Sequence, residues 1–234
     1  MNSRSAKQEQ LDNLSLTGEP LHKALQSLAW INRWLGNYRS TIKAVLAVNH
    51  AEKKHLKIID LGCGGGDLIL AIAKALRKKN RTFSIVGIDG NSNSLNYARE
   101  KCAGFEEITF EEANILSPAF KPPVCDILIS SHFIYHFSEE ELACFINTKL
   151  SGINIAFICS ELERSRIAFF LFKLTGFLLP LSKIARQDGL LAIKRSFTKK
   201  EWLIILKKTT IAVFSLRRVL LFRIQLILFF DNKI

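Results

Sequence analysis

Four glycines stand within five positions of the stretch IIDLGCGGGDLIL, residues 58–70. They follow an apolar run that ends at Asp60, and a helical pattern of apolar residues begins at Asp67. Glycine at such a point lets the backbone turn sharply and approach a ligand closely. The residue types and their spacing therefore predict a ligand-binding turn between a strand and a helix.

The position of Asp67 indicates what kind of ligand the turn holds. A dinucleotide fingerprint, G-x-G-x-x-G, that began at Gly62 and Gly64 would need its third glycine where this chain has Asp67. A pyrophosphate rests on the amino end of that helix, where a carboxylate would repel it. The sequence therefore favours a ligand without phosphate. Carboxylates suited to a cationic or hydroxyl-bearing ligand come from Asp60 and from Asp89, which ends the next predicted strand, residues 83–89.

The spacing Asp60-x-Gly62-x-Gly64-x-Gly66 resembles the first motif of the class I S-adenosylmethionine-dependent methyltransferases. The resemblance implies S-adenosylmethionine as the cofactor, with Asp60 near its ammonium and sulfonium groups and Asp89 on its ribose hydroxyls. Asn114 stands where the family often has an aspartate that bonds the adenine amino group, and its amide oxygen can accept the same bond. The expected cofactor site consists of Asp60, Gly62, Cys63, Gly64, Gly66, Asp89, Gly90, Asn114, Ile115 and Ser130.

Two histidines follow the predicted strand CDILISS, residues 125–131, at the sheet edge where ligands bind in this architecture. His132 and His136 are therefore the candidate catalytic bases, because removal of a proton activates an oxygen acceptor. A structural role, with a hydrogen bond to a loop, is the alternative for both. The five cysteines form no C-x-x-C pair, so we expect neither a metal nor a disulfide framework.

Apolar runs and helical patterns alternate along the chain, which predicts an α/β, Rossmann-like, doubly wound, mostly parallel seven-stranded sheet. We expect residues 1–52 to form an N-terminal helical cap of the same domain and residues 53–234 to form the S-adenosylmethionine-binding part. Beyond the sheet core, the pattern predicts an apolar helix at about 166–180, then a basic loop, a helix that begins near 197, and two closing strands.

The segments SSHFIYHFSEEE, SELERSR and DGLLAIKRSFTKKEW resemble bacterial methyltransferases of the quinone-biosynthesis type and relatives associated with type III polyketide synthases. This resemblance implies a small hydrophobic acceptor, phenolic, quinone-like or polyketide, and O-methylation. An RNA methyltransferase is one alternative, which only the net charge of +12 supports, so we do not expect a nucleic-acid partner. A non-catalytic cofactor-binding protein is the other. The oligomeric state stays open.

The apolar segment 167–181 carries Lys173 and is too short to span a bilayer. It therefore packs on the core, lines an apolar pocket or touches a membrane surface. We expect it to form a lid over the acceptor, together with N-terminal helices around Trp30, Trp34 and Tyr38. The polar N-terminus lacks a secretory signal, so we expect a cytoplasmic protein with an optional peripheral contact to the inner face of the membrane.

Overall fold

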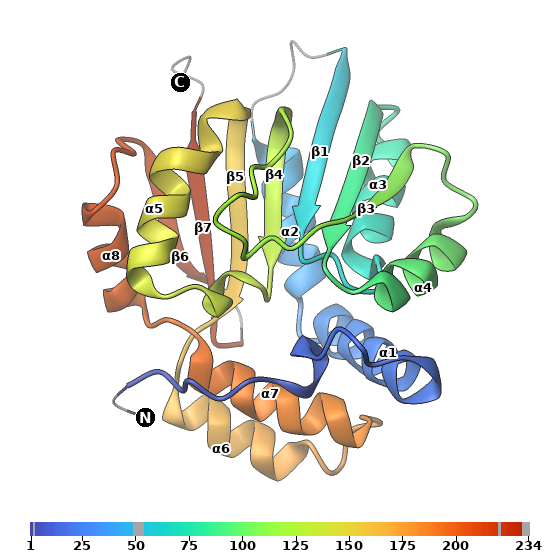
Figure 1. Ribbon diagram of the computed structural model, residues 1–234, viewed down its shortest axis with the longest axis vertical. Helices are drawn as coiled ribbons and strands as arrows, with labels where there is room; N and C mark the ends of the chain where they lie inside the picture. Colours follow the sequence, from blue (N-terminus) through green and yellow to red (C-terminus); the bar gives the residue numbers. More distant parts are fainter. Residues whose placement is uncertain (2, 49–53, 220, 231–234) are drawn as a thin grey trace.

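A computed structural model describes residues 1, 3–48, 54–219 and 221–230 of the chain. These residues form a seven-stranded sheet in the order β3-β2-β1-β4-β5-β7-β6 (Figure 1). The strands are β1 His55–Leu61, β2 Thr82–Asp89, β3 Ile108–Glu112, β4 Cys125–Ser131, β5 Ile153–Leu162, β6 Phe214–Val219 and β7 Arg223–Phe229.

The first five strands are parallel to one another, whereas β7 runs antiparallel to both β5 and β6. The order reverses direction at β1, which pairs with β2 on one side and β4 on the other. Ligands bind outside the carboxyl ends of the strands at such a point. The predicted Rossmann-like, mostly parallel seven-stranded sheet is therefore confirmed.

Helices cover both faces of the sheet. The helices α2 Asn37–Ala47, α3 Asp67–Lys78 and α4 Ser92–Cys102 cover one face, and α5 Glu139–Lys149 and α8 Lys199–Lys207 cover the other. Successive strand residues supply the two cores, because side chains alternate across a sheet. Ile58 packs with α2 and α3, whereas its neighbour Ile59 belongs to the core that contains Trp202 of α8.

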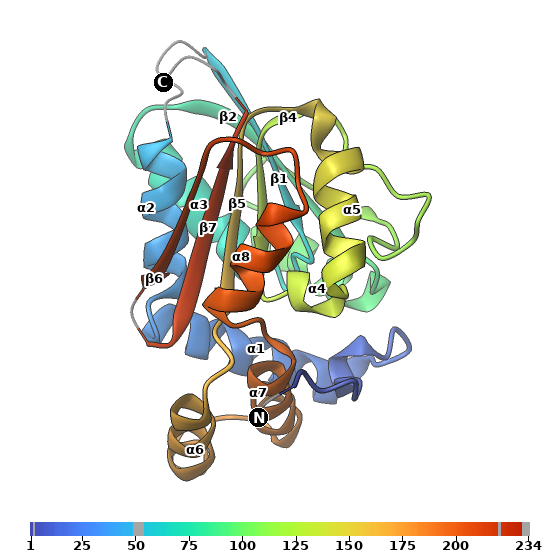
Figure 2. The same cartoon turned by 90° about the vertical axis from the view of Figure 1, so that its left-hand side faces the viewer.

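Three further helices lie beyond the carboxyl ends of the parallel strands: α1 Gly18–Trp34, α6 Arg166–Thr175 and α7 Lys183–Arg195 (Figures 1 and 2). The cap is thus built from both ends of the sequence, and α2, which we placed in the N-terminal cap, packs on the sheet instead. The proposed boundary between residues 52 and 53 lies outside the described residues.

The predicted basic loop after residue 180 is wrong, because α7 occupies it. The Ser182 hydroxyl caps this helix by accepting a hydrogen bond from the Ala185 amide at 3.1 Å. Ala185 and Ile193 are buried against the rest of the cap. The preceding helix is correspondingly shorter than predicted and ends at Thr175 rather than near residue 180.

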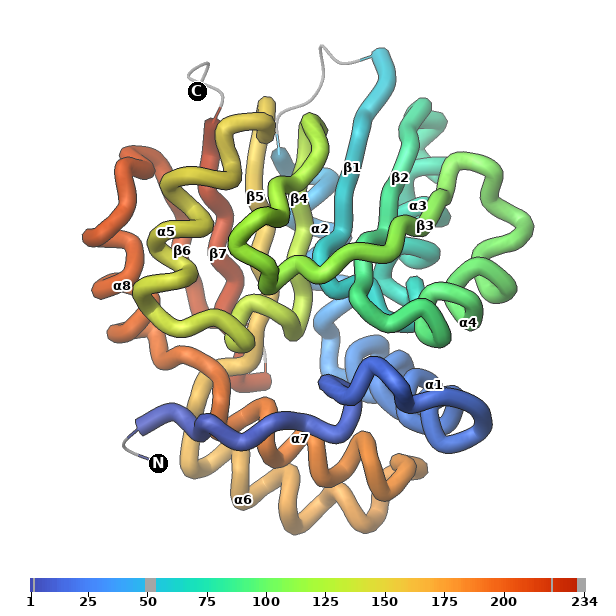
Figure 3. The backbone as a smooth tube through the Cα atoms, viewed as in Figure 1, coloured from blue at the N-terminus to red at the C-terminus, as the bar shows by residue number. Residues whose placement is uncertain are grey.

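Residues 3–14, here called the N-terminal strap, run across α7 toward α1 (Figure 3). The Ser5 amide donates to the Lys194 carbonyl at 3.1 Å, and the Gln10 and Leu11 amides donate to the Asp188 carboxylate at 2.9 and 3.0 Å. The Arg4 side chain donates to the carbonyls of Arg195 at 2.6 Å and Phe137 at 2.9 Å. These bonds tie the strap both to the cap and to the segment after β4.

Among the helices that the structure describes, none combines the length and the apolar character needed to cross a bilayer.

Candidate functional site

A cavity of about 720 Å³ lies between the carboxyl edge of the sheet, the cap helices and the strap. Its sheet side carries the glycine turn after β1, the end of β2 and the segments that follow β3 and β4. Its cap side carries apolar side chains from three helices and from the residue that follows α1: Leu25, Leu28, Ile31, Leu35, Ala168, Leu171, Phe172, Ala192 and Ile193. This volume is typical of a site for small molecules.

The glycine turn has a backbone that side chains would not tolerate. Gly62, Gly64 and Gly66 all have positive φ angles, +73°, +51° and +73°. A Cβ at Gly62 would come within 2.6 Å of the Phe133 ring, and one at Gly66 would lie 3.1 Å from the Ala98 Cβ. Glycine is required here both by conformation and by space, as the sequence predicts. Asp67 begins α3 directly after the turn and pairs with Lys101.

Asp89 connects the end of β2 to the glycine turn. Its Oδ2 accepts the Gly64 amide and its Oδ1 accepts the Asn91 amide, both at 2.9 Å. Asp89 and Gly90 line the cavity, and burial raises the pKa of the Asp89 carboxyl. Asp89 thus shapes the turn and also presents an acceptor group to a ligand in the cavity.

Asp60 lies at the end of β1, behind the glycine turn, and is 2% exposed. Burial, followed by repulsion from Asp89, raises the pKa of its carboxyl to about 8. Its Oδ1 has no hydrogen-bond partner among the described residues. Asp60 is not among the residues that line the cavity. A buried, unpartnered carboxyl oxygen directly behind a glycine-rich turn nevertheless fits a cationic group held on that turn, so the site suits the ammonium and sulfonium of S-adenosylmethionine.

The other predicted cofactor residues occupy different surroundings. Asn114 and Ile115 line the cavity, and the Asn114 Oδ1 accepts the Leu116 amide at 3.1 Å. Cys63 is buried within the turn, and burial raises the pKa of its thiol. Ser130 is fully buried, its hydroxyl donates to the Leu61 carbonyl at 3.4 Å, and it is not among the residues that line the cavity.

Both predicted catalytic histidines line the cavity, but an arginine holds each ring. Arg223 donates to Nε2 of His132, and Arg195 donates to Nδ1 of His136 at 2.9 Å. Arginine only donates, so each accepting nitrogen uses its lone pair in that bond. Burial, then Arg223, lowers the pKa of His132, and burial chiefly lowers that of His136 to about 4. This geometry favours the structural alternative for both rings, and their role as bases stays a prediction.

An acidic group that the sequence analysis did not single out faces the same cavity. Glu9 of the strap accepts a hydrogen bond from the Tyr135 hydroxyl at 3.1 Å and one from Arg195 at 3.5 Å. Burial raises the pKa of its carboxyl to about 8. Nothing in the polar sequence of residues 1–13 indicates this position, because the contacts join residues more than a hundred positions apart.

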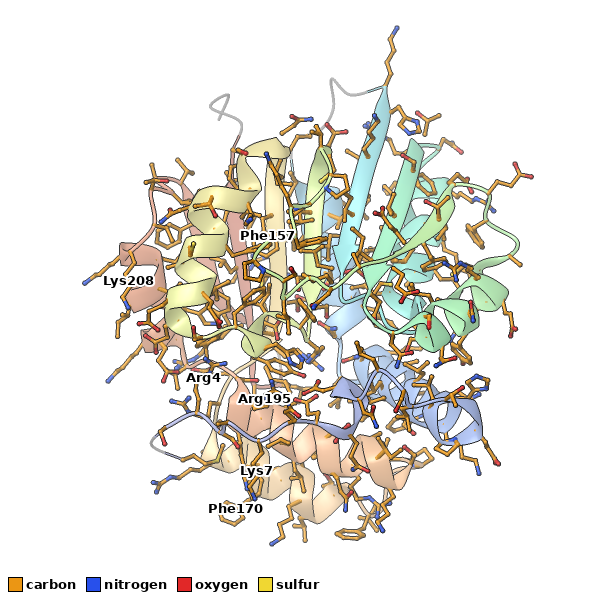
Figure 4. The ribbon with its side chains drawn as sticks, viewed as in Figure 1. Arg4, Lys7, Phe157, Phe170, Arg195 and Lys208 are labelled. Carbon is orange, nitrogen blue, oxygen red and sulfur yellow. The ribbon has the colours of Figure 1, made fainter. Side chains whose placement is uncertain are left out.

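The ligand atoms of Glu9, Asp12 and His136 lie within 4.8 Å of one another, which is close enough for a metal ion. However, the Arg195 guanidinium contacts all three, with its Nη1 2.7 Å from the Asp12 carboxylate. A fixed positive charge therefore already occupies the ligand atoms of this cluster, so the arrangement does not favour a metal. Arg195 is labelled in Figure 4.

The predicted lid is present only in part, because α2, which carries Tyr38, contributes no residue to the cavity wall. The helices α1 and α6 contribute to the cavity wall, and α7 adds to them. Trp30, Trp34 and Tyr38 are not among the lining residues. The two tryptophan rings pack on each other with their centroids 5.9 Å apart, and Trp34 is exposed. The apolar helix α6 lines the cavity, as predicted. The side of α1 that faces the cavity carries leucines and an isoleucine instead of the predicted aromatic residues.

Two curated proteins match part of this chain in sequence. The ubiquinone/menaquinone biosynthesis C-methyltransferase of Campylobacter jejuni is 37% identical over 92 residues, which are 39% of this chain and 38% of that protein. The carboxy-S-adenosyl-L-methionine synthase of a Nitratiruptor species is 31% identical over 124 residues, 51% of this chain and 48% of that protein. The matches thus span about half or less of these relatives.

Solved structures share the fold at low identity. An S-adenosylmethionine-dependent methyltransferase from Aquifex aeolicus aligns with a TM-score of 0.61 at 13% identity, covering 91% of this chain and 99% of that one. Magnesium protoporphyrin IX methyltransferase from Synechocystis aligns with a TM-score of 0.55 at 18% identity, covering 84% of this chain and 83% of that one. Residues 52–201 match the family described as "Methyltransferase domain". The chain therefore belongs to this family of methyltransferase domains, and its fold is that of S-adenosylmethionine-dependent methyltransferases.

Proposed function

We propose that this enzyme methylates a small hydrophobic acceptor with a phenolic or quinone-like ring, and that the methyl group goes to a hydroxyl oxygen. The continuity of one cavity carries the proposal. The glycine turn and Asp89 stand at one side, and apolar residues of α1, α6 and α7 stand at the other. A cofactor on the turn and an apolar acceptor under the cap would therefore share a single cavity, where alignment and exclusion of water favour transfer.

S-adenosylmethionine supplies an electrophilic methyl group when it is bound. The residues of the chain must then orient the acceptor and take the proton that a phenol loses. Glu9 fits the second task better than either histidine, because its carboxylate lines the cavity and its raised pKa of about 8 makes it a stronger proton acceptor. Tyr135 and Arg195 hold this carboxylate in place.

Carbon methylation is a second candidate, favoured by the similarity to the C-methyltransferase of Campylobacter jejuni. Loss of the phenolic proton serves both reactions, since a phenolate is activated at its oxygen and at the ortho and para ring carbons. On the carbon route the ring hydrogen of the methylated carbon then leaves as a proton and the oxygen is protonated again, so each route releases one proton. Mass spectrometry gives the number of methyl groups transferred, and nuclear magnetic resonance of the product identifies the methylated atom.

The test uses methyl-labelled cofactor with phenols and hydroquinones that carry alkyl chains of increasing length, and with total RNA in a parallel reaction. We expect label in the phenols and none in RNA. Label in RNA without any labelled small molecule would overturn the proposal, and RNA binding that weakens steeply with salt would accompany that outcome.

The variant Glu9→Gln tests the proton acceptor. We expect kcat to fall by about 100-fold with an unchanged cofactor dissociation constant, as is common for loss of a general base. In the wild type, kcat should rise with pH up to about 8, because Glu9 must be ionised to accept the proton. The control Glu19→Gln removes an exposed carboxylate that pairs with Lys23 and should change neither quantity. Full activity of Glu9→Gln would show that another group takes the proton.

A further inference from the structure

The helix α6 is apolar on two opposite sides. One side carries Ala168, Phe172 and Thr175, which line the cavity. The other side carries large apolar residues that are strongly exposed, namely Ile167 (64%), Phe170 (64%) and Leu174 (74%), and the chain continues this surface with Phe177 (70%) and Leu178 (84%). These five residues are here called the α6 face.

Ordinary core packing does not explain the α6 face. Within α6 only Ala168 is buried. A helix that is apolar all round is normally enclosed on all sides, and large exposed apolar patches usually mark an interaction surface. Figure 2 shows α6 at the far end of the cap, and Figure 4 shows Phe170 pointing away from the rest of the molecule. The surface is therefore placed to meet a partner.

The charged residues in this segment of the chain all have the same sign. Between Glu163 and Asp188 the chain contains no acidic residue, and it contains Lys173 and Lys183 together with several arginines. Both lysines are exposed. The Arg186 guanidinium lies over the Phe177 ring at 4.5 Å, at the edge of the α6 face. An apolar surface with a basic rim is the arrangement that binds an anionic lipid headgroup region.

We infer that the α6 face docks on the surface of an anionic lipid bilayer, with its apolar side chains among the acyl chains and Lys173 and Lys183 at the headgroups. The opposite side of the same helix lines the cavity. Docking would therefore place the cavity wall at the membrane, where an apolar acceptor is dissolved. A second copy of this chain fits less well, because a two-fold contact would bring two basic rims together.

Vesicle co-sedimentation tests the inference, with protein of wild-type sequence and vesicles of phosphatidylcholine with or without about 30% phosphatidylglycerol. We expect binding to the anionic vesicles that weakens as salt is raised, and much weaker binding to pure phosphatidylcholine. The variant Phe170→Ser/Leu174→Ser should lower the partition coefficient about tenfold or more. Neither residue lines the cavity, so the variant should keep its fold and its cofactor affinity.

A matched control is Leu203→Ser/Ile204→Ser on α8, which removes two apolar side chains of 40% and 48% exposure from another surface. Its vesicle binding should equal that of the wild type. The variant Lys173→Glu/Lys183→Glu should lose binding to anionic vesicles without any loss of apolar surface.

Equal binding of wild type and Phe170→Ser/Leu174→Ser would overturn the inference. A dimer that this variant dissociates, without vesicle binding by the wild type, would assign the α6 face to self-association instead. Vesicle binding is measured without turnover, so this inference and the proposed acceptor class can fail independently.

Discussion

Asp60 provides the sharpest test of how the cofactor site works, because its carboxyl is mostly protonated in the free protein at neutral pH. Burial and the neighbouring Asp89 raise its pKa to about 8. A cationic ligand beside it would favour the ionised form and restore a lower pKa. Binding of S-adenosylmethionine should therefore release a proton, and the affinity should increase as pH rises toward 8.

The size of the effect follows from the ionised fraction of the free protein. With a pKa of about 8, roughly one tenth of the Asp60 carboxyls are ionised at pH 7. Cofactor binding at about pH 7 should then release about 0.9 proton. Between about pH 5.5 and 7.5 the affinity should increase roughly 70-fold, or about 2.5 kcal/mol. The range ends there because the cofactor's own α-amino group has a pKa of about 8.

Isothermal titration calorimetry in buffers with different ionisation enthalpies measures both the dissociation constant and the number of protons released. The variant Asp60→Asn should lose the pH dependence and bind weakly at every pH. Asp67→Asn is the control, since it removes a carboxylate at the start of α3 that pairs with Lys101 and leaves Asp60 in place. A pH-independent affinity of the wild type, or a slope that persists in Asp60→Asn, would refute the assigned role.

Other variants test the surroundings of the turn. Asp89→Ala should weaken cofactor binding by about 1.5 to 3 kcal/mol, because it removes an acceptor from the cavity and releases the Gly64 amide; calorimetry measures this, and an unchanged dissociation constant would contradict it. Gly62→Ala should lower the free energy of unfolding by about 1 to 3 kcal/mol, because the backbone has a positive φ and the new Cβ would meet the Phe133 ring. The control Gly104→Ala has open space around it and should change the free energy of unfolding by less than about 0.5 kcal/mol. Chemical denaturation measures both. Arg195→Met should raise the pKa of His136 from about 4, because a neighbouring positive charge is lost; an unmoved titration of the His136 ring in nuclear magnetic resonance would rule out this coupling.

Local sequence patterns predicted the parts of the site that depend on backbone shape. The glycines at 62, 64 and 66 are required by their own positive φ angles, which are a local property of the turn. The place of Asp89 in the site was predictable because this residue ends a strand whose pattern is visible in the sequence. The alternation of strands and helices likewise predicted the sheet, since each element carries its own apolar pattern.

Tertiary contacts decided what the sequence did not reveal. The helix α7 contains Gly189 and many charged residues, so its local pattern favours a loop, yet Gly189 gives room to the Phe172 ring, which a Cβ would approach to 2.8 Å. The arginines that hold the histidines are Arg195 and Arg223, which lie 59 and 91 positions away in the chain. Such pairings depend on how the cap and β7 are placed, and no local pattern specifies them.

The N-terminal strap also makes the opening of the cavity a cooperative local event. Its Arg4 donates to two backbone carbonyls in the segment after β4, while Ser5, Gln10 and Leu11 bond to α7. The pair α6–α7 cannot swing away from the sheet as one rigid flap while these bonds persist, so the strap must detach before the cap moves. We therefore expect the amides of Ser5, Gln10 and Leu11 to form a separate opening unit, which should exchange hydrogen with solvent faster than the central strands and become protected when a ligand fills the cavity.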